Sequence, residues 1–170
     1  MRRLKFFLVL MTALALAACT HEATAPVPAA PEFVSVLNMS DPQAATQLTR
    51  GFFGLENGAW RWTASKFAVA LAPPAGAAKN GARLDLKITF PSGTIDKLGP
   101  TTLSATAGGA ALQPETYNKD GNYVYSVDVP ASVLSGDKVT IEFATDKAQP
   151  PAVDRRELAL IVTKVGLVSK

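Results

Sequence analysis

Apolar and polar residues alternate with a period of two along several stretches of this chain. In residues 83–90 every second side chain is apolar, and the side chains between them are charged or polar. This is the period of a β-strand with one face on a core and the other in water. The same alternation predicts strands at 122–129, at 138–143 and around 67–71.

The closing stretch, 157–168, is almost continuously apolar. It fits a strand buried on both faces or, less well, a helix. The β-branched residues Val162, Thr163 and Val165 favour the strand. Shorter apolar stretches predict further strands at 33–37, 52–55, 59–63 and 102–106.

Turn-forming residues separate these stretches, at 73–76, 91–93, 108–109, 119–122 and 135–137. Residues 130–134 are expected to form one helical turn, because a proline stands at their start. About eight to ten short strands with turns at this spacing predict an all-β fold. We expect an antiparallel β-sandwich, either jelly-roll or immunoglobulin-like.

The first 18 residues have the pattern of a signal peptide. A basic start, Met1–Lys5, precedes an uncharged apolar stretch at 6–18, which is shorter than the ~17–25 residues of a membrane-spanning helix. The stretch ends in Leu-Ala-Ala-Cys at 16–19, which resembles a bacterial lipobox. The alternative is an ordinary secretory signal followed by an incidental cysteine.

The lipobox resemblance implies cleavage before Cys19, a diacylglyceryl thioether on its sulfur and an acyl chain, such as palmitate, on its amino group. Several acyl chains give stable membrane anchoring. Thr20 favours the outer membrane if the source is Gram-negative. Residues 19–31 then form a tether rich in alanine, proline and threonine, and 32–170 form the folded domain.

Charge and composition exclude several functions. Arg2, Arg3 and Lys5 are three of the 17 basic residues and no acid lies among residues 1–18, so the mature chain has 14 basic against 14 acidic residues. A neutral chain gives no argument for nucleic acid as a partner. The single histidine, His21, adjoins the tether, and the single cysteine is used for lipidation. Zinc sites of His and Cys, and Ser-His-Asp or Cys-His catalysis, are therefore excluded, and we expect no metal, no cofactor and no enzyme.

Trp60, Arg61 and Trp62 form the segment with the most promising chemistry. In a strand the two tryptophans share one face and Arg61 lies on the other. Aromatic rings offer a flat surface for the C–H face of a sugar, and a nearby carboxylate and arginine can bind its hydroxyls. The alternative is a pair of core tryptophans, each burying about 150–250 Å², and one core and one edge tryptophan would also fit.

Arg156, just before the final strand, is the second candidate. It could pair with Glu56 across the sandwich, either as a structural tie or in the wall of a polar pocket. The candidate cluster, for binding or for structure, is thus Glu56, Trp60, Arg61, Trp62 and Arg156. The other acidic residues are scattered singly, which predicts solvated surface.

These two ends of the domain resemble a known module. The segments 51–56 (GFFGLE), 60–63 (WRWT) and 154–160 (DRRELAL) look like a β-sandwich module of bacterial envelope proteins, also found beside glycosyltransferase domains. Ala159 stands where the module has glycine. The resemblance implies an association with carbohydrate. We therefore expect a non-catalytic, lipid-anchored envelope module that binds glycan or another envelope component. The alternatives are an assembly lipoprotein with a protein partner and, less favoured, a carboxylate-based glycan hydrolase.

Overall fold

The computed structural model describes residues 32–151 and 155–170. The predicted signal peptide, lipidation site and tether, together with Asp154, lie outside the described residues. Within the described part, all ten strands pair antiparallel in one curled sheet, which confirms the predicted all-β antiparallel fold. The strands are β1 (Val36–Asn38), β2 (Leu48–Glu56), β3 (Trp60–Leu71), β4 (Ala82–Phe90), β5 (Thr101–Ala107), β6 (Ala110–Ala111), β7 (Glu115–Tyr117), β8 (Gly121–Val129), β9 (Val139–Thr145) and β10 (Ile161–Ser169).

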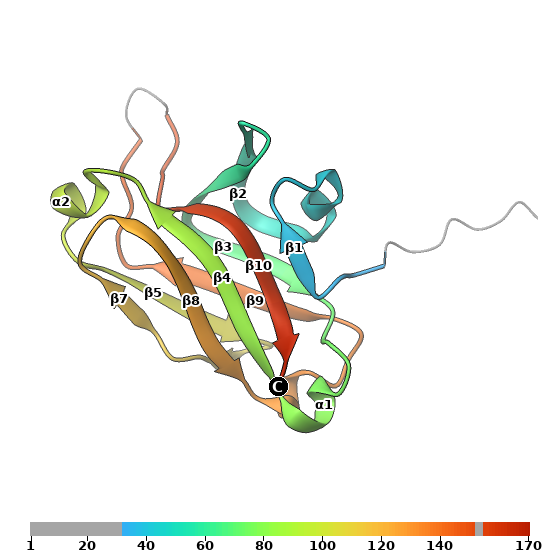
Figure 1. Cartoon of the computed structure of the whole chain (residues 1–170). Coiled ribbons are helices and arrows are strands. Elements are labelled where there is room, and N and C mark those ends of the chain that lie inside the picture. The colour runs from blue at the N-terminus through green and yellow to red at the C-terminus, as the bar shows by residue number, and fades with distance from the viewer. Residues whose placement is uncertain (1–31, 152–154) are drawn as a thin grey trace, which may run out of the picture. The chain divides into compact units, whose positions relative to one another are not determined.

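The curled sheet forms two layers. Its strand order is β6-β5-β9-β3-β10-β4-β8, with β1 added to β10, β2 to β3 and β7 to β5. In Figure 1, β8, β4, β10 and β1 form the near layer, and β5, β9 and β3 cross behind them. The layers are joined where β3 and β10 begin, because Trp62 pairs with Ile161 and Arg61 with Val162.

The core lies between the two layers, where the alternation predicts it. On β4, Leu84, Leu86 and Ile88 are no more than 2% exposed. On the opposing layer, the rings of Phe67 and Phe143 stack with centroids 4.8 Å apart. The inward residues of both layers belong to one hydrophobic cluster, so burial of one face of each strand holds the layers together.

Short helical segments connect the strands: Pro42–Gln47, α1 (Ala77–Asn80), α2 (Thr94–Leu98) and Ala131–Val133. The last confirms the predicted helical turn, whereas α1 and α2 were not predicted. Both follow glycines with left-handed backbone, Gly76 and Gly93, that the sequence marks as turns. In the described part of the chain, no helix is long and apolar enough to cross a membrane.

Several strand boundaries differ from prediction. The predicted strands at 59–63 and 67–71 are one strand, β3, and the strand predicted at 33–37 is β1 at Val36–Asn38. The closing strand begins at Ile161, and the prediction that it is buried on both faces is wrong. Its inward residues Val162 and Val165 are buried, but Thr163 is exposed at a register shift between Val162 and Lys164.

The β2–β3 hairpin is shaped by two local features. Asn57 and Gly58 both have positive φ (49° and 65°), and the Ala59 N–H donates to the Glu56 carbonyl at 3.0 Å. Such a tight turn favours Asn-Gly. At Gly51 (φ 71°) β2 lies so close to β3 that a Cβ would meet the Lys66 carbonyl oxygen at 2.1 Å. The hairpin therefore places Glu56 directly opposite Trp60.

Candidate functional site

Arg156 and Glu56 form the ion pair that the sequence predicts. Arg156 Nη1 donates to Glu56 Oε1 at 2.9 Å, and the two side chains are 29% and 35% exposed. The Arg156 guanidinium also lies over the Phe53 ring, 5.1 Å from its centroid. The segment before β10 is thus tied to the end of β2 by a charge-assisted hydrogen bond and a cation–π contact.

Trp60 and Trp62 are both partly buried and lie outside the hydrophobic core cluster. Alternation along β3 puts them on one face. Glu56 shares that face, because it is the cross-strand partner of Trp60. The interpretation that both tryptophans are core residues is therefore wrong, while their role as a sugar-binding surface stays a prediction.

Arg61 lies on the opposite face of β3. Its cross-strand partners are Leu55 and Val162, and its Nη1 donates to the Phe53 carbonyl at 3.1 Å. Arg61 Nε and Trp60 Nε1 are buried and have no hydrogen-bond partner among the described residues. The predicted cluster is therefore divided by the strand, with Trp60, Trp62 and Glu56 on one side and Arg61 on the other.

Strand register extends the tryptophan face across the near layer. Trp62 pairs with Ile161, Ile161 with Thr89, and Thr89 with Asn122. Directly paired residues point to the same side of a sheet, so these four side chains form a row about 14 Å long at ~4.8 Å per strand. Within the row, Thr89 Oγ1 donates to Asn122 Oδ1 at 2.6 Å.

Two hollows adjoin this row on the outer face of β10, β4 and β8. The larger, about 330 Å³, lies beside Thr89 and Asn122, and the smaller, about 90 Å³, lies toward β1. They share Lys87 and Val124, and we call them together the outer groove. Its outward-facing lining residues are Thr89, Asn122, Lys87, Val124, Thr163, Lys164, Asp85, Val168, Gly166 and Val36.

Asp85 is held in the outer groove by hydrogen bonds and by nearby positive charges. Its carboxylate accepts hydrogen bonds from Ser126 Oγ at 2.7 Å and from Arg83 Nε at 3.0 Å. Burial of Asp85 opposes its ionisation, but the bonds from Ser126 and Arg83 and the charges of Arg83 and Lys164 prevail and lower its pKa below the usual 3.8. Asp85 is therefore an anion that is already bound within the sheet face.

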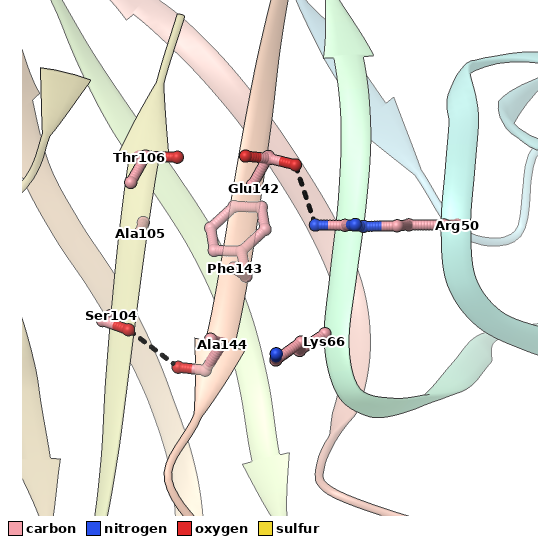
Figure 2. A pocket seen from close by; sticks show the side chains of 8 residues that line it. All are labelled: Arg50, Lys66, Ser104, Ala105, Thr106, Glu142, Phe143 and Ala144. Carbon is pink, nitrogen blue, oxygen red and sulfur yellow. Dashed lines mark hydrogen bonds and ion pairs between the residues drawn. The ribbon is translucent and has the colours of Figure 1, made fainter. Parts of the chain in front are cut away.

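The far layer has a separate hollow of about 230 Å³ on its own outer face. Figure 2 shows Arg50 reaching from β2 past β3 to Glu142 on β9, with an Nη2–Oε1 distance of 2.8 Å. Lys66, Ser104 and Thr106 complete its polar wall. Phe143 lines it but is 2% exposed, so this hollow offers hydrogen-bonding groups without an accessible aromatic ring.

Several acidic residues expected to be solvated surface are structural ties instead. Asp120 accepts from the N–H groups of Gly93 and Ile95, at 2.5 and 2.7 Å, at the start of α2. Asp146 accepts from the Thr102 N–H at 2.7 Å. The N–H groups that bind these carboxylates lie in distant segments of the chain, so the sequence could not predict the hydrogen bonds. Among the described residues no group of three His, Cys, Asp or Glu could hold a metal ion.

Four residues of the outer groove were not predicted as site residues: Lys87, Thr89, Asn122 and Lys164. Alternation places Lys87 and Thr89 outward, and a strand at 122–129 was predicted. What was missing was the register between β4, β8 and β10, which places these residues on the same face of the sheet as Trp62.

No protein-family model matches the chain, and no curated protein matches it in sequence. Solved structures show a distant likeness. A region of a family GH115 4-O-methyl-α-glucuronidase, BtGH115A, described as specific for decorated arabinogalactans, is 13% identical with a TM-score of 0.49. The match covers 87% of this chain and 19% of the glucuronidase.

Two carbohydrate-binding modules give similar matches. A family 35 module from Clostridium thermocellum is 11% identical with a TM-score of 0.46, over 79% of this chain and 98% of the module. A CBM36-1 domain of a xylanase from the hindgut metagenome of Trinervitermes trinervoides is also 11% identical, with a TM-score of 0.36, over 71% and 94%. Scores this low give no argument about the ligands of this chain.

Proposed function

We propose that this protein is a non-catalytic glycan-binding module that binds sugar along the outer face of β10, β4 and β8. The observation that supports this most directly is the row from Trp62 through Ile161 to Thr89 and Asn122, which joins a partly exposed indole to a polar hollow. Small-molecule sites typically combine an apolar or aromatic wall with a few polar groups that fix orientation.

Sugar chemistry fits this arrangement. One face of a pyranose ring presents C–H groups, which pack on an indole, while its hydroxyls need hydrogen-bond partners. Thr89 and Asn122 offer a hydroxyl and an amide, which between them can both donate and accept. The row is longer than one sugar ring, so we infer an oligosaccharide lying across the strands rather than a single sugar.

The competing functions have weaker support in the described structure. A glycan hydrolase needs two carboxyl groups about 5–10 Å apart, one of them in a buried setting that makes it a general acid. Glu32 and Asp137 share one hollow, but both are exposed. An assembly factor needs a contiguous apolar patch, whereas the exposed large apolar residues of the described chain, Val34, Leu55 and Val124, lie on three different strands or segments.

We further propose that lipid on Cys19 holds this module at the envelope surface, facing the periplasm or the cell exterior. Leu-Ala-Ala-Cys at 16–19 supports the anchor. The tether at 20–31 contains three prolines, which favour extended backbone at ~3.1 Å per residue. Twelve residues would then reach roughly 35 Å from the membrane, enough for a small domain to meet glycan beside it.

The experiment uses the full-length protein purified in detergent and titrated with xylohexaose, cellohexaose, chitohexaose and oligogalacturonate. Trp60 and Trp62 are the two tryptophans of the chain, so intrinsic fluorescence reports directly on the proposed site. At least one sugar should shift the emission and protect the indoles from iodide quenching. Trp62→Ala should weaken binding in calorimetry by about tenfold or more.

Phe33→Ala is the matched control, because Phe33 is a partly buried aromatic outside the outer groove, in contact with Lys138. It should bind sugar as the wild type does. Binding that survives Trp62→Ala, or fluorescence that responds to none of the sugars, would overturn the proposal.

A further inference from the structure

Lys87 and Lys164 are directly paired across β4 and β10, with Val124 of β8 paired to Lys87 on the other side. Directly opposite residues have Cβ atoms about 4.5–5.5 Å apart and point to the same side. The two ammonium groups therefore stand over the same part of the outer groove, and both line its smaller hollow.

Neither lysine is neutralised by an ion pair with a described residue. The carboxylate that lines the smaller hollow with them is Asp85, which is influenced by the charge of Lys164 but accepts hydrogen bonds from Arg83 and Ser126. Two carboxylates, Asp85 and Asp128, lie near Arg83, and Asp128 is also paired with Lys170. With Lys87 and Lys164 added, this face keeps an excess of positive charge.

Like charges directly opposite on neighbouring strands destabilise a sheet. An anion bound between the two lysines would remove this repulsion and add charge-assisted hydrogen bonds. Sugar hydroxyls have no net charge, so they would relieve the repulsion less and would form weaker hydrogen bonds with the lysines. The pairing of Lys87 with Lys164 therefore lowers the stability of the free protein, and a bound anion would restore it.

We propose that the outer groove selects acidic glycans, with Lys87 and Lys164 together binding a carboxylate or phosphate group of the sugar chain. Lys87 is two residues from Thr89, about 7 Å along β4 and at right angles to the row, so an acidic substituent on a sugar unit over Ile161 and Thr89 comes within reach of the two lysine side chains. This inference rests on the proposed glycan binding and names the ligand class at the same site.

The test compares oligogalacturonate with its methyl ester, which has the same sugar chain without the charge. Binding to the full-length protein is measured by tryptophan fluorescence and calorimetry at low salt. The acid should bind about tenfold more tightly. In the Lys87→Gln/Lys164→Gln double variant this preference should disappear, so that acid and ester bind with equal affinity. Competition by inorganic phosphate against acetate distinguishes phosphate from carboxylate recognition.

Thermal unfolding gives a second readout. Lys87→Gln should raise the melting temperature of the unliganded protein by about 1–3 °C, because the repulsion is gone. Lys164→Gln should raise it less, because it also removes an attraction to Asp85. Lys79→Gln is the control, because Lys79 is exposed on α1. Its replacement should not raise the melting temperature and should leave the preference for the acid over the ester unchanged.

The outcomes separate the two proposals. If the wild type binds acid and ester equally in a Trp62-dependent way, the anionic preference is overturned and glycan binding stands. If neither form of oligogalacturonate binds but a neutral hexaose does, the anionic preference is overturned and glycan binding stands. If no sugar binds, both proposals fall. If the lysine variants lose binding only to phosphatidylglycerol vesicles, the anionic partner is a membrane surface and the glycan inference is overturned.

Discussion

Arg156 and Glu56 are 100 positions apart in the chain, yet the guanidinium Nη1 and the carboxylate Oε1 lie 2.9 Å from each other. The pair connects the end of β2 to the segment that leads into β10. These are the strands on either side of the start of β3, where the two layers of the sandwich are joined. The ion pair thus stabilises the corner that bears Trp60 and Trp62.

Arg156→Ala should lower the free energy of unfolding by about 1–2 kcal/mol. This lies between the ~0.2–1 kcal/mol of exposed pairs and the ~3–5 kcal/mol of buried ones, because both side chains are about one-third exposed. Urea unfolding of Arg156→Ala, Glu56→Gln and the double variant gives the coupling between them. Arg155→Ala, an exposed neighbour, is the control. If the coupling free energy between Arg156 and Glu56 is zero and Arg156→Ala abolishes sugar binding, the pair belongs to the binding site instead.

Gly51→Ala should destabilise the protein by more than about 2 kcal/mol, through the combination of backbone strain and steric clash. Its φ is 71°, and a Cβ there would collide with the Lys66 carbonyl oxygen. Gly54→Ala on the same strand is the matched control, because a Cβ at Gly54 meets nothing within 4 Å. Thermal melting should show the large loss only for Gly51→Ala. Equal melting temperatures would contradict the close approach of β2 to β3.

Asp85 should make the protein less stable in acid. Its folded-state pKa lies below the 3.8 of the unfolded chain, so its contribution to stability is present above pH 3.8 and disappears as the pH falls through the folded-state value. Urea unfolding at pH 7 and at about pH 3 should therefore show a smaller acid loss in Ser126→Ala, which removes one hydrogen bond to the carboxylate. Ser104→Ala, on the other layer, should keep the wild-type loss.

Cys19→Ser should prevent lipidation and processing by the lipoprotein signal peptidase. The prediction follows from Leu-Ala-Ala-Cys at 16–19 and from Cys19 being the single cysteine of the chain. Labelled palmitate should enter the wild-type protein and not the variant, and the variant should keep its signal peptide. Label retained by Cys19→Ser would contradict the lipoprotein assignment.

Local pattern was sufficient to predict most strands and the core. The alternation at 83–90 and 122–129 corresponds to β4 and β8 almost residue for residue, because a half-buried strand imposes its period on the sequence. The predicted strand boundaries were less accurate where contacts with other strands determine them. β3 continues through 64–66 because β2 passes close to Lys66 at Gly51 and β9 pairs with β3 from Lys66 onward. The bulge at Thr163 depends on the neighbouring strand.

The sequence by itself determined the all-β class and the faces of the strands, and it predicted the pairing of Arg156 with Glu56, since alternation and charge are local or pairwise properties. Only the tertiary structure decided that Trp62 shares a row with Thr89 and Asn122, and that Lys87 stands opposite Lys164. The physical reason is register. A strand's own sequence fixes which side chains point outward, but hydrogen bonding between distant strands fixes which outward side chains become neighbours.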